Sequence, residues 1–505
     1  MLILIEESTT HIDYRVLKDV FSIAWMLFNT LFLFECYLQV IYNRQRGVIS
    51  LIDTIFGKHG DEKRTFYKGL MTIAIPVVIQ NLLSSSLNMV DNLMIGRLGE
   101  NSIAAVGLAN QVFFIYSLII FGLSSGASIF YAQYHGSRDY SSLRRFLGMA
   151  SAIALTAAMV FTAAAVIFPG ALLRIFTTEP DVIADGTAYL RIVGLSYALN
   201  SLSFSLVFAL RATNQAMVPM AASSVALATN TVLNYILING YLGFPALGVS
   251  GAAIATVIAR VIEFSILIRA VYGRDNVLKA KISELLSFTK EDISKFFKVA
   301  SPVIINESMW AAGIVMYNFS YSKIGVDAFA SVQITNVVSQ LFYVFAFGVC
   351  NAASIMIGNR IGEGRYDLVR DYSRRIMRLT LFLGLSTSGL MLLLKGPILS
   401  LYSVAPETLA NTGVLLTIVA AIIPVRIFNV LFVVGFFRGG GDTRFAMGAE
   451  LISLWIVGVP AVAAAALVFR LPVTVAYSLS IAEDLVKFAL CYPRYRSGNW
   501  FRRVI

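Results

Sequence analysis

Residues 99–144 read GENSIAAVGLANQVFFIYSLIIFGLSSGASIFYAQYHGSRDYSSLR, and residues 325–370 read GVDAFASVQITNVVSQLFYVFAFGVCNAASIMIGNRIGEGRYDLVR. The two segments align without a gap at an offset of 226 residues. Apolar matches arise easily between hydrophobic segments, so the informative matches are those of Gly, Asn, Tyr and Arg. These pair Gly99 with Gly325, Asn110 with Asn336, Gly122 with Gly348, Gly136 with Gly362, Tyr140 with Tyr366 and Arg144 with Arg370. The chain therefore contains an internal repeat.

The composition places this repeat in a membrane. Of the 505 residues, 57% are hydrophobic and 14% are charged, whereas soluble domains have about 25% charged residues. Apolar stretches of about 20 residues recur, and each can cross a ~30 Å hydrocarbon core. The net charge of +11 comes from basic residues that lie between these stretches, so we expect no nucleic-acid partner. The sequence predicts an all-α polytopic membrane protein.

Twelve segments have the length and apolarity of transmembrane helices. Their approximate limits are 66–95, 102–134, 143–168, 185–210, 217–240, 249–273, 294–323, 328–358, 370–394, 410–437, 444–468 and 473–493. A further apolar run at 19–42 contains Glu35 and Gln39. This run is an extra spanning helix or an interfacial helix, or it is not part of the protein because the true start codon lies downstream.

The longest polar connection divides the twelve spans six and six. The predicted organisation is an N-terminal extension at 1–60, a first lobe at 61–275, a linker at 276–293 and a second lobe at 294–505. Because the repeat offset corresponds to an even number of spans, the two six-helix bundles run parallel. They are predicted to be related by a pseudo-two-fold axis along the membrane normal. Transporters use such repeats to place a substrate site between two lobes that can rock.

Basic residues are distributed unevenly between the loops. The loops after the odd-numbered spans contain Arg97, Arg174, Lys323, Lys395 and Arg470. Basic residues are far more frequent in the loops after the even-numbered spans and in the C-terminal segment. By the positive-inside rule, the even-numbered loops and the C-terminus are predicted to be cytoplasmic. We expect a multi-pass protein of the plasma (inner) membrane.

The sequence offers little for redox, metal or enzyme chemistry. Cys36, Cys350 and Cys491 lie in or beside apolar spans without a CxxC pattern, and the three histidines lie outside the spans. We therefore expect no disulfide framework, no cofactor and no enzymatic activity.

Asp91, in the outer half of the first span, is the first acid that requires an explanation. No basic residue lies within one helical turn before it. A carboxylate near hydrocarbon must be protonated, bind a cation or face water, because an unpaired charge there is costly. Each of these states suits coupling to H⁺ or Na⁺. The structural alternative is an interfacial residue that caps the short loop.

Asn230 and Asn234 are spaced by four residues, which places both amides on one helical face. Their oxygens are hard ligands suited to Na⁺, although Asn also joins membrane helices by hydrogen bonds. Thr256 adds a hydroxyl, which a threonine within a span usually gives to its own backbone.

Glu307 lies near the middle of the seventh span, five residues after Pro302. It is a second-lobe candidate for carrying a proton or attracting a cationic substrate, and its structural alternative is a hydrogen bond to a neighbouring helix. Other acids near or within spans are expected to pair locally with Arg260 or Lys487. They are Glu263, Glu450, Glu483 and Asp484.

Several motifs resemble those of the multidrug and toxic compound extrusion (MATE) family of transporters. They are VDNLMIGRLG at 90–99, AAVGLANQ at 104–111, FGLSSGASIFYAQYHG at 121–136, GFPALGVSGAAIAT at 243–256, SYSKIGVDAFASV at 320–332 and RGGGDT at 438–443. The resemblance covers about residues 66–500. It implies two six-helix bundles around a central cavity and export of amphipathic, often cationic compounds in exchange for entering Na⁺ or H⁺.

The resemblance also implies roles for individual residues. Asp91 matches the cation-coupling acid of the first lobe, and Asn230, Asn234 and Thr256 match the other positions of that site, which is thus a possible Na⁺ site. Many family members carry Asp where this chain has Asn234. The loss of that charge should weaken Na⁺ binding, and it leaves H⁺ coupling through Asp91 open. Glu307 matches the seventh-span acid of some subgroups only loosely.

We therefore predict a monomeric, cation-coupled antiporter that exports amphipathic, cationic organic compounds across the lipid bilayer by alternating access. The alternative is a flippase of lipid-linked precursors, which would need a cationic cavity for phosphates. The span residues relevant to such a cavity are Arg191, Arg260 and Arg426. A membrane-embedded transferase is a weaker alternative, because HGSRD at 135–139 has no evident catalytic partner.

Overall fold

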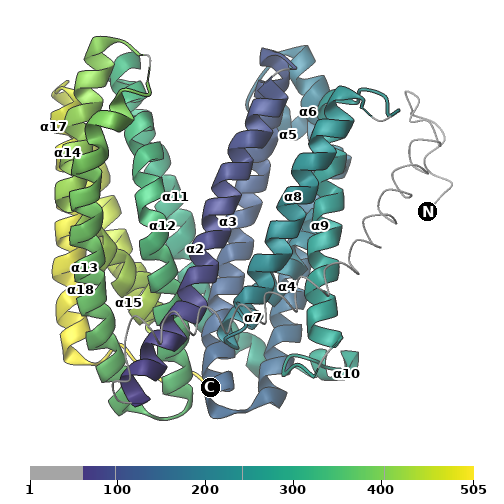
Figure 1. The fold of residues 1–505 in the computed structure, drawn as a ribbon, viewed down its shortest axis with the longest axis vertical. Coiled ribbons are helices and arrows are strands. Elements are labelled where there is room, and N and C mark those ends of the chain that lie inside the picture. Colours follow the sequence, from purple (N-terminus) through teal and green to yellow (C-terminus); the bar gives the residue numbers. More distant parts are fainter. Residues whose placement is uncertain (1–60, 97, 242, 274, 403) are drawn as a thin grey trace.

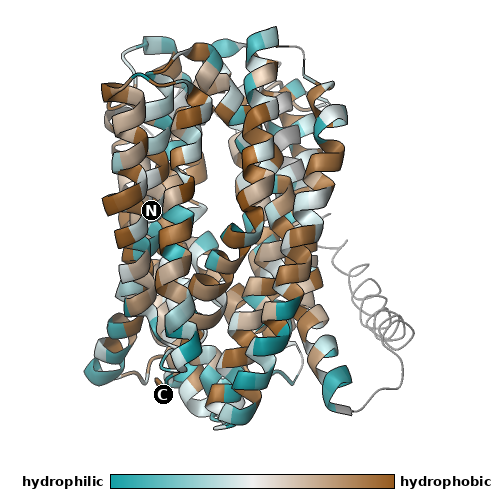
Figure 2. Ribbon diagram, turned by 90° about the vertical axis from the view of Figure 1, so that its left-hand side faces the viewer, coloured by the Kyte–Doolittle hydropathy of each residue, from teal (hydrophilic) through white to brown (hydrophobic). Residues whose placement is uncertain are grey.

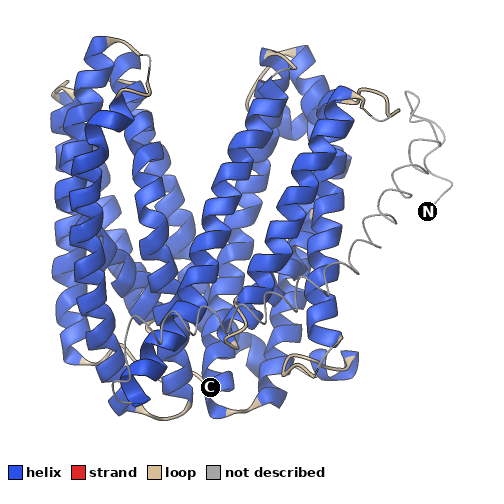
Figure 3. Cartoon of the chain, in the orientation of Figure 1, coloured by secondary structure: helices blue, strands red, loops and turns tan. Residues whose placement is uncertain are grey.

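The computed structural model describes residues 61–505 with the exception of 97, 242, 274 and 403. Apart from one isolated bridge between Gly441 and Phe501, regular structure in these residues is helical (Figure 3). The extension at 1–60, with its candidate helix at 19–42, lies outside the described residues.

The helices form two bundles (Figure 1). The first contains α2 (Asp61–Gly96), α3 (Glu100–Ser137), α4 (Tyr140–Ile167), α5 (Pro169–Arg174), α6 (Pro180–Gly194), α7 (Tyr197–Ala212), α8 (Met217–Asn239) and α9 (Gly248–Tyr272). The short helix α10 (Ile282–Leu285) lies in the connection. The second contains α11 (Lys290–Ser322), α12 (Val326–Gly362), α13 (Tyr366–Leu399), α14 (Pro406–Val430), η1 (Leu431–Arg438), α15 (Thr443–Leu451), η2 (Ile452–Gly458), α16 (Val459–Ala463), η3 (Ala464–Val468), α17 (Val473–Leu479) and α18 (Ile481–Ser497). The exact lobe boundaries stay a prediction.

The predicted spans are present as helices. Among the described residues, ten helices are long and apolar enough to cross a membrane, and α6 with α7 makes an eleventh that is bent by 48°. The twelfth, α17 with α18, is less apolar because α18 carries Glu483, Asp484 and Lys487. The predicted fold class is confirmed, but the spans predicted at 185–210 and 473–493 are broken helices rather than continuous ones.

Polar side chains satisfy the backbone where α6 ends and α7 begins. The Ser196 hydroxyl donates to the carbonyl of Val193 at 2.7 Å, and the Thr162 hydroxyl donates to the carbonyl of Gly194 at 3.1 Å. Carbonyls that leave a helical ladder inside a membrane need such partners, because no water can replace them.

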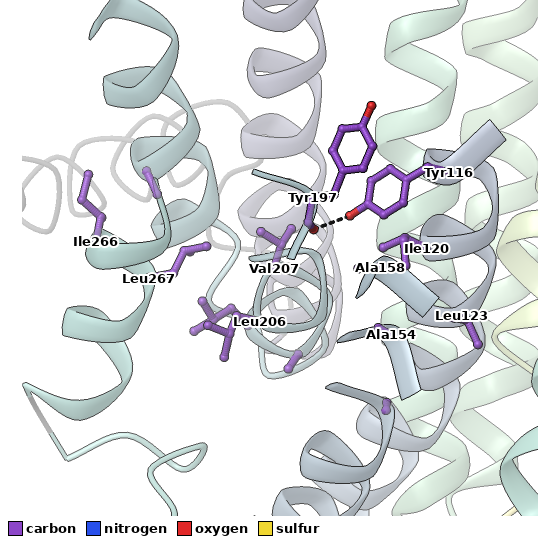
Figure 4. Packing of buried hydrophobic residues seen from close by; sticks show 14 of the residues in the cluster. Tyr116, Ile120, Leu123, Ala154, Ala158, Tyr197, Leu206, Val207, Ile266 and Leu267 are labelled. Atoms are coloured by element: carbon purple, nitrogen blue, oxygen red, sulfur yellow. Dashed lines mark hydrogen bonds between the residues drawn. The ribbon is translucent and has the colours of Figure 1, made fainter. Parts of the chain in front are cut away.

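An aromatic contact holds this bend against α3. The rings of Tyr116 and Tyr197 stack with centroids 4.6 Å apart and planes 12° apart. The Tyr116 hydroxyl donates to the backbone carbonyl of Tyr197 at 2.7 Å (Figure 4). Both residues are fully buried. The contact fixes α7 directly after the break.

The repeat reappears as backbone conformation at the start of α3 and of α12. Gly99 precedes α3 with φ of 113°, and its repeat mate Gly325 precedes α12 with φ of 157°. With ψ near 170° and 165°, both residues occupy a region that is essentially restricted to glycine. The repeat therefore conserves the turn that leads into each of these helices.

The contacts between the two bundles are reciprocal. A Cβ atom at Gly136 would collide with the backbone carbonyl of Asn359, and one at Gly362 would collide with that of Gln133. Each residue of the first pair lies 226 positions from its counterpart in the second pair. The same reciprocity joins Gly122 to Ile304 and Gly348 to Val78. These pairs are the contacts that a two-fold axis between the bundles requires.

One further contact lies on this axis. A Cβ atom at Gly358 would meet the methyl group of Ala132, and these two residues are repeat mates of each other. A residue can touch its own repeat mate only where the two-fold axis passes between them.

The bundles meet at one end and diverge toward the other (Figure 1). We call the end where α3 and α12 finish the closed end and the opposite end the diverging end. Hydrophilic residues are concentrated at the closed end, whereas hydrophobic residues cover the middle of the bundles (Figure 2). The middle band therefore has the character of a surface that faces lipid.

Candidate functional site

Three helices of the first bundle bring the predicted cation site together. Asp91 lies near the diverging end of α2 and is half-buried against α8. The Asn234 amide donates to Asp91 Oδ1 at 2.8 Å and to Asn230 Oδ1 at 3.2 Å. Thr256 Oγ1, from α9, lies 3.3 Å from the Asn230 amide nitrogen. All four predicted residues are thus connected.

The Asn230 amide fits its surroundings better in the opposite orientation. Its nitrogen then donates to both Asp91 oxygens, at 2.9 and 3.2 Å, and its oxygen accepts from the hydroxyl and the backbone N–H of Thr256. In this arrangement both asparagines present N–H groups to the carboxylate. The two amides can therefore stabilise Asp91 without any cation.

The same side chains can also present oxygens. Asn230 and Asn234 are 7% and 2% exposed, and Asn234 Oδ1 is buried without a hydrogen-bond donor in the described residues. If the amides turn, the site offers one carboxylate, two amide oxygens and one hydroxyl, which are hard ligands of the kind that Na⁺ accepts. These residues fit either a proton on Asp91 or one monovalent cation.

The site lacks a basic partner. Within the part of the chain that the structure describes, no Lys or Arg forms an ion pair with Asp91; its hydrogen-bond donors are the two uncharged amides. The nearby Arg260 is paired with Glu263 at 2.7 Å. A carboxylate in this setting is free to exchange a cation, because no permanent positive charge holds it.

Tyr189 on α6 also belongs to this site, although the sequence did not single it out. Its hydroxyl forms a hydrogen bond with the Thr256 side chain and interacts electrostatically with the Asp91 carboxylate. Tyr189 is 7% exposed. Nothing in the sequence distinguishes it from the other tyrosines, because its position depends on the bend between α6 and α7.

Glu307 lies elsewhere, between the bundles, and is held by Arg438. The Arg438 guanidinium donates to Glu307 Oε1 at 2.6 Å and to the Ser125 hydroxyl of α3 at 3.1 Å. Arg438 is the first residue of the RGGGDT motif, and it is 4% exposed. This geometry favours the structural alternative for Glu307, a polar link to neighbouring helices.

The first bundle contains a counterpart of this link. Arg211, at the closed end of α7, donates to Gln80 of α2 at 2.5 Å. Gln80 donates to Ser223, and Ser223 donates to Glu263, each at 2.7 Å. In both bundles an arginine therefore binds the first helix four or five residues after its proline, Pro76 or Pro302.

The family model described as MatE matches residues 76–236 and 302–464. The chain belongs to the MatE family. The two matched segments begin at the offset of the internal repeat, so the MatE model recognises each bundle separately.

Curated relatives are similar over most of this MatE chain. It is 24% identical over 444 residues to "Uncharacterized transporter YisQ" of Bacillus subtilis, with 86% of this chain and 95% of the relative covered. It is 25% identical over 450 residues to "Probable multidrug resistance protein NorM" of Thermotoga maritima, with 87% and 94% covered. The MatE chain is thus a relative of multi-pass membrane transporters with multidrug efflux members.

A solved structure shares the MatE fold. A protein described as the "outward-facing conformation of a multidrug resistance MATE family transporter of the MOP superfamily" aligns with a TM-score of 0.78 and 18% identity. The alignment covers 86% of this chain and 97% of that one. At this level of identity the likeness concerns the fold alone.

Proposed function

We propose that this protein is an antiporter that couples the entry of H⁺ or Na⁺ to the export of amphipathic, cationic organic compounds. The observation that carries the proposal is the setting of Asp91. It is a half-buried carboxylate in the membrane, and its described partners are neutral amides from another helix. Such a group can change its charge by taking up one cation, which is the requirement for coupling.

The position of α2 supports a link between this site and the movement of the bundles. α2 carries Asp91 near its diverging end, while its lower part packs against α12 of the other bundle, with Val78 against Gly348. Cation binding at Asp91 draws on groups from α8 and α9 and changes how α2 sits against them. An ion drives transport only if its affinity differs between the two conformations.

The distribution of basic residues supports an orientation with the closed end in the cytoplasm. The α3–α4 connection, α10 and residues 498–505 all lie at this end (Figure 1). In this orientation the diverging end faces the outside, and the substrate leaves from that end when a cation occupies Asp91. We expect a monomer, because each chain supplies both halves of the two-fold arrangement.

The flippase alternative has less support. Two of the three arginines that could have lined an anionic cavity are engaged by carboxylates: Arg260 by Glu263 at 2.7 Å and Arg426 by Asp484 at 2.6 Å. Arg191 is exposed on α6. A cavity for lipid-linked phosphates would need free guanidinium groups.

The test uses purified protein in liposomes with a cationic dye as the reporter. A Na⁺ gradient and a pH gradient are imposed separately, and dye flux is recorded. We expect flux under at least one gradient, and we expect Asp91→Asn to lose gradient-driven flux while it still binds dye. Asp185→Asn serves as the matched control, because the partner of this acid among the described residues is the Ser102 hydroxyl, away from the Asp91 site. Full gradient-driven flux in Asp91→Asn would overturn the coupling role.

A further inference from the structure

The second bundle contains a buried group of charges that the proposed function does not use. We call it the second-bundle cluster. It consists of Arg426 on α14, Glu450 on α15, and Glu483, Asp484 and Lys487 on α18. Glu450, Asp484 and Lys487 are at most 7% exposed. The local pair of Glu483 with Lys487 that the sequence predicted is present, and the structure adds Arg426 and Glu450 from two other helices.

Three ion pairs hold the cluster together. Lys487 Nζ lies 2.7 Å from Glu450 Oε1 and 2.9 Å from Glu483 Oε1. Arg426 Nε lies 2.6 Å from Asp484 Oδ2. Three carboxylates thus face two bases, which leaves one negative charge in excess if all five groups are ionised.

The hydrogen bonds of Asn429, next to the cluster, also indicate that acceptors outnumber donors. Asn429 donates through its amide to the Asp484 carbonyl at 2.9 Å, but its own Oδ1 is buried without a donor among the described residues. The cluster therefore has more acceptors than donors as well as more negative than positive charge. One additional proton would correct both, and an uncompensated charge in the membrane interior is costly.

Of the three carboxylates, Glu450 has the fewest hydrogen-bond donors. Glu483 accepts from Lys487 and also from the Tyr317 hydroxyl at 2.6 Å. Asp484 accepts from Arg426 and lies 3.5 Å from the Asn429 amide. Among the described residues, the only donor to the Glu450 carboxylate is Lys487, which it shares with Glu483.

The neighbouring elements supply no further positive charge to Glu450. The ionisable groups close to Glu450 are Lys487, Glu483, Glu307 and Cys491. Two further arginines in the surroundings are already paired with acids. Arg438 pairs with Glu307, and Arg494, which lies over the Phe445 ring of α15, pairs with Asp442. The π-helical segment η2, which begins two residues after Glu450, has no titratable side chain. Such segments within α-helices occur frequently at functional sites.

We propose that Glu450 is a proton-binding site of the second bundle, independent of Asp91. A proton fits better than a metal ion, because the Lys487 ammonium already occupies the point between Glu450 and Glu483. No group of three or more acidic, His or Cys side chains in the described residues suits a metal. The proton neutralises the excess negative charge of the cluster.

Infrared spectroscopy of the full chain tests this directly, since a protonated carboxyl absorbs apart from a carboxylate. The measurement uses Asp91→Asn protein at neutral pH, so that Asp91 cannot contribute. We expect the absorption of one protonated carboxyl there, and we expect its loss when Glu450→Gln is added. Glu307→Gln is the matched control, because Glu307 has its own ion pair with Arg438, at 2.6 Å. Absence of the absorption, or its persistence in Glu450→Gln, would overturn the proposal.

Thermal stability gives a second readout. Gln imitates a neutral carboxyl, so Glu450→Gln should unfold at the same temperature as the parent at neutral pH and at a higher temperature at alkaline pH. Asp484→Asn should unfold at a lower temperature than the parent at both pH values, because it leaves Arg426 without its carboxylate. A Glu450→Gln protein that is destabilised like Asp484→Asn would show that Glu450 is needed as an anion, which contradicts the proposal. Neither readout depends on transport, so a failure here is separate from a failure at Asp91.

Discussion

At the level of single residues, the first-bundle site depends on one amide where a second carboxylate would fit. Asn234 donates to Asp91 and keeps an unpaired oxygen buried beside it. The site therefore contains one formal negative charge, which one proton or one Na⁺ neutralises. The preference of the site for H⁺ or for Na⁺ therefore depends on Asn234.

We expect Asn234→Asp to make transport more dependent on Na⁺. Two carboxylates that share one site cannot both ionise unless a cation lies between them, and a second anionic ligand strengthens the attraction for Na⁺. The measurement compares dye flux under a Na⁺ gradient in the parent and the variant at constant pH. Asn239→Asp is the control, because Asn239 is exposed on the same helix and bonds only to the Tyr235 carbonyl. An unchanged ratio of Na⁺-driven to H⁺-driven flux would contradict this prediction.

The residues of this site could be predicted from the sequence to different degrees. The spacing of Asn230 and Asn234 fixes a shared face from helical geometry alone, and an acid such as Asp91 stands out in an apolar span. Tyr189 of this site, and Arg438 beside Glu307, could not be found in this way. Their roles follow from the bend after Gly194 and from the approach of η1 to α3, which depend on packing between residues far apart in the chain.

At the level of elements, the segment at 500–505 forms a strap across the closed end. Gln133 of α3 is fully buried, and its side chain donates to the carbonyl of Arg502 at 3.0 Å and accepts from the N–H of Val504 at 2.8 Å. The N–H of Arg502 donates to the carbonyl of Gly440, in the second bundle, at 2.7 Å. The strap therefore bonds to both bundles at once.

We expect Gln133→Ala to release this strap. The substitution leaves one N–H and one carbonyl of the strap unpaired, at a cost of about 1–3 kcal/mol for each group that stays buried. Labelling of a cysteine introduced at Val504 should become faster, and the unfolding temperature should fall. Ser137→Ala is the control, because that hydroxyl bonds only within its own helix, to the carbonyl of Tyr134. Equal labelling rates in the two variants would show that Gln133 does not hold the strap.

The sequence predicted where the helices lie, but it did not predict where a helix is interrupted. Apolarity locates the spans at 185–210, 410–437 and 473–493, but it carries no information on whether a helical ladder is interrupted. The ladder is interrupted at Ser480 and changes to π-helical turns in η1. Local sequence therefore could not reveal them.

At the level of the whole molecule, two equivalent glycines control how closely the bundles approach. Gly136 and Gly362 each lie against a backbone carbonyl of the other bundle. We expect Gly136→Ala and Gly362→Ala to weaken the closed end by about 1–3 kcal/mol each, the usual cost of an overpacked contact. The population should shift toward conformations in which this end is separated.

The measurement is the distance between spin labels at Ser141 and Asp367, which are exposed repeat mates at the closed end. Both substitutions should increase the fraction of long distances to a similar extent, because the two contacts are equivalent. Gly389→Ala is the control, since a Cβ atom there meets nothing within 4 Å. A shift with one glycine but not the other would argue against a symmetric closure.

The contact between Ala132 and Gly358 has an evolutionary consequence. At this point the chain packs against the copy of itself that lies 226 residues away, as in the isologous interface of a homodimer, where one patch meets its own duplicate. A half-length ancestor with a small residue at this position would have formed the same interface between two separate molecules. Fusion of two such genes would allow each copy to diverge, one toward the neutral amides around Asp91 and the other toward the charged pairs around Lys487.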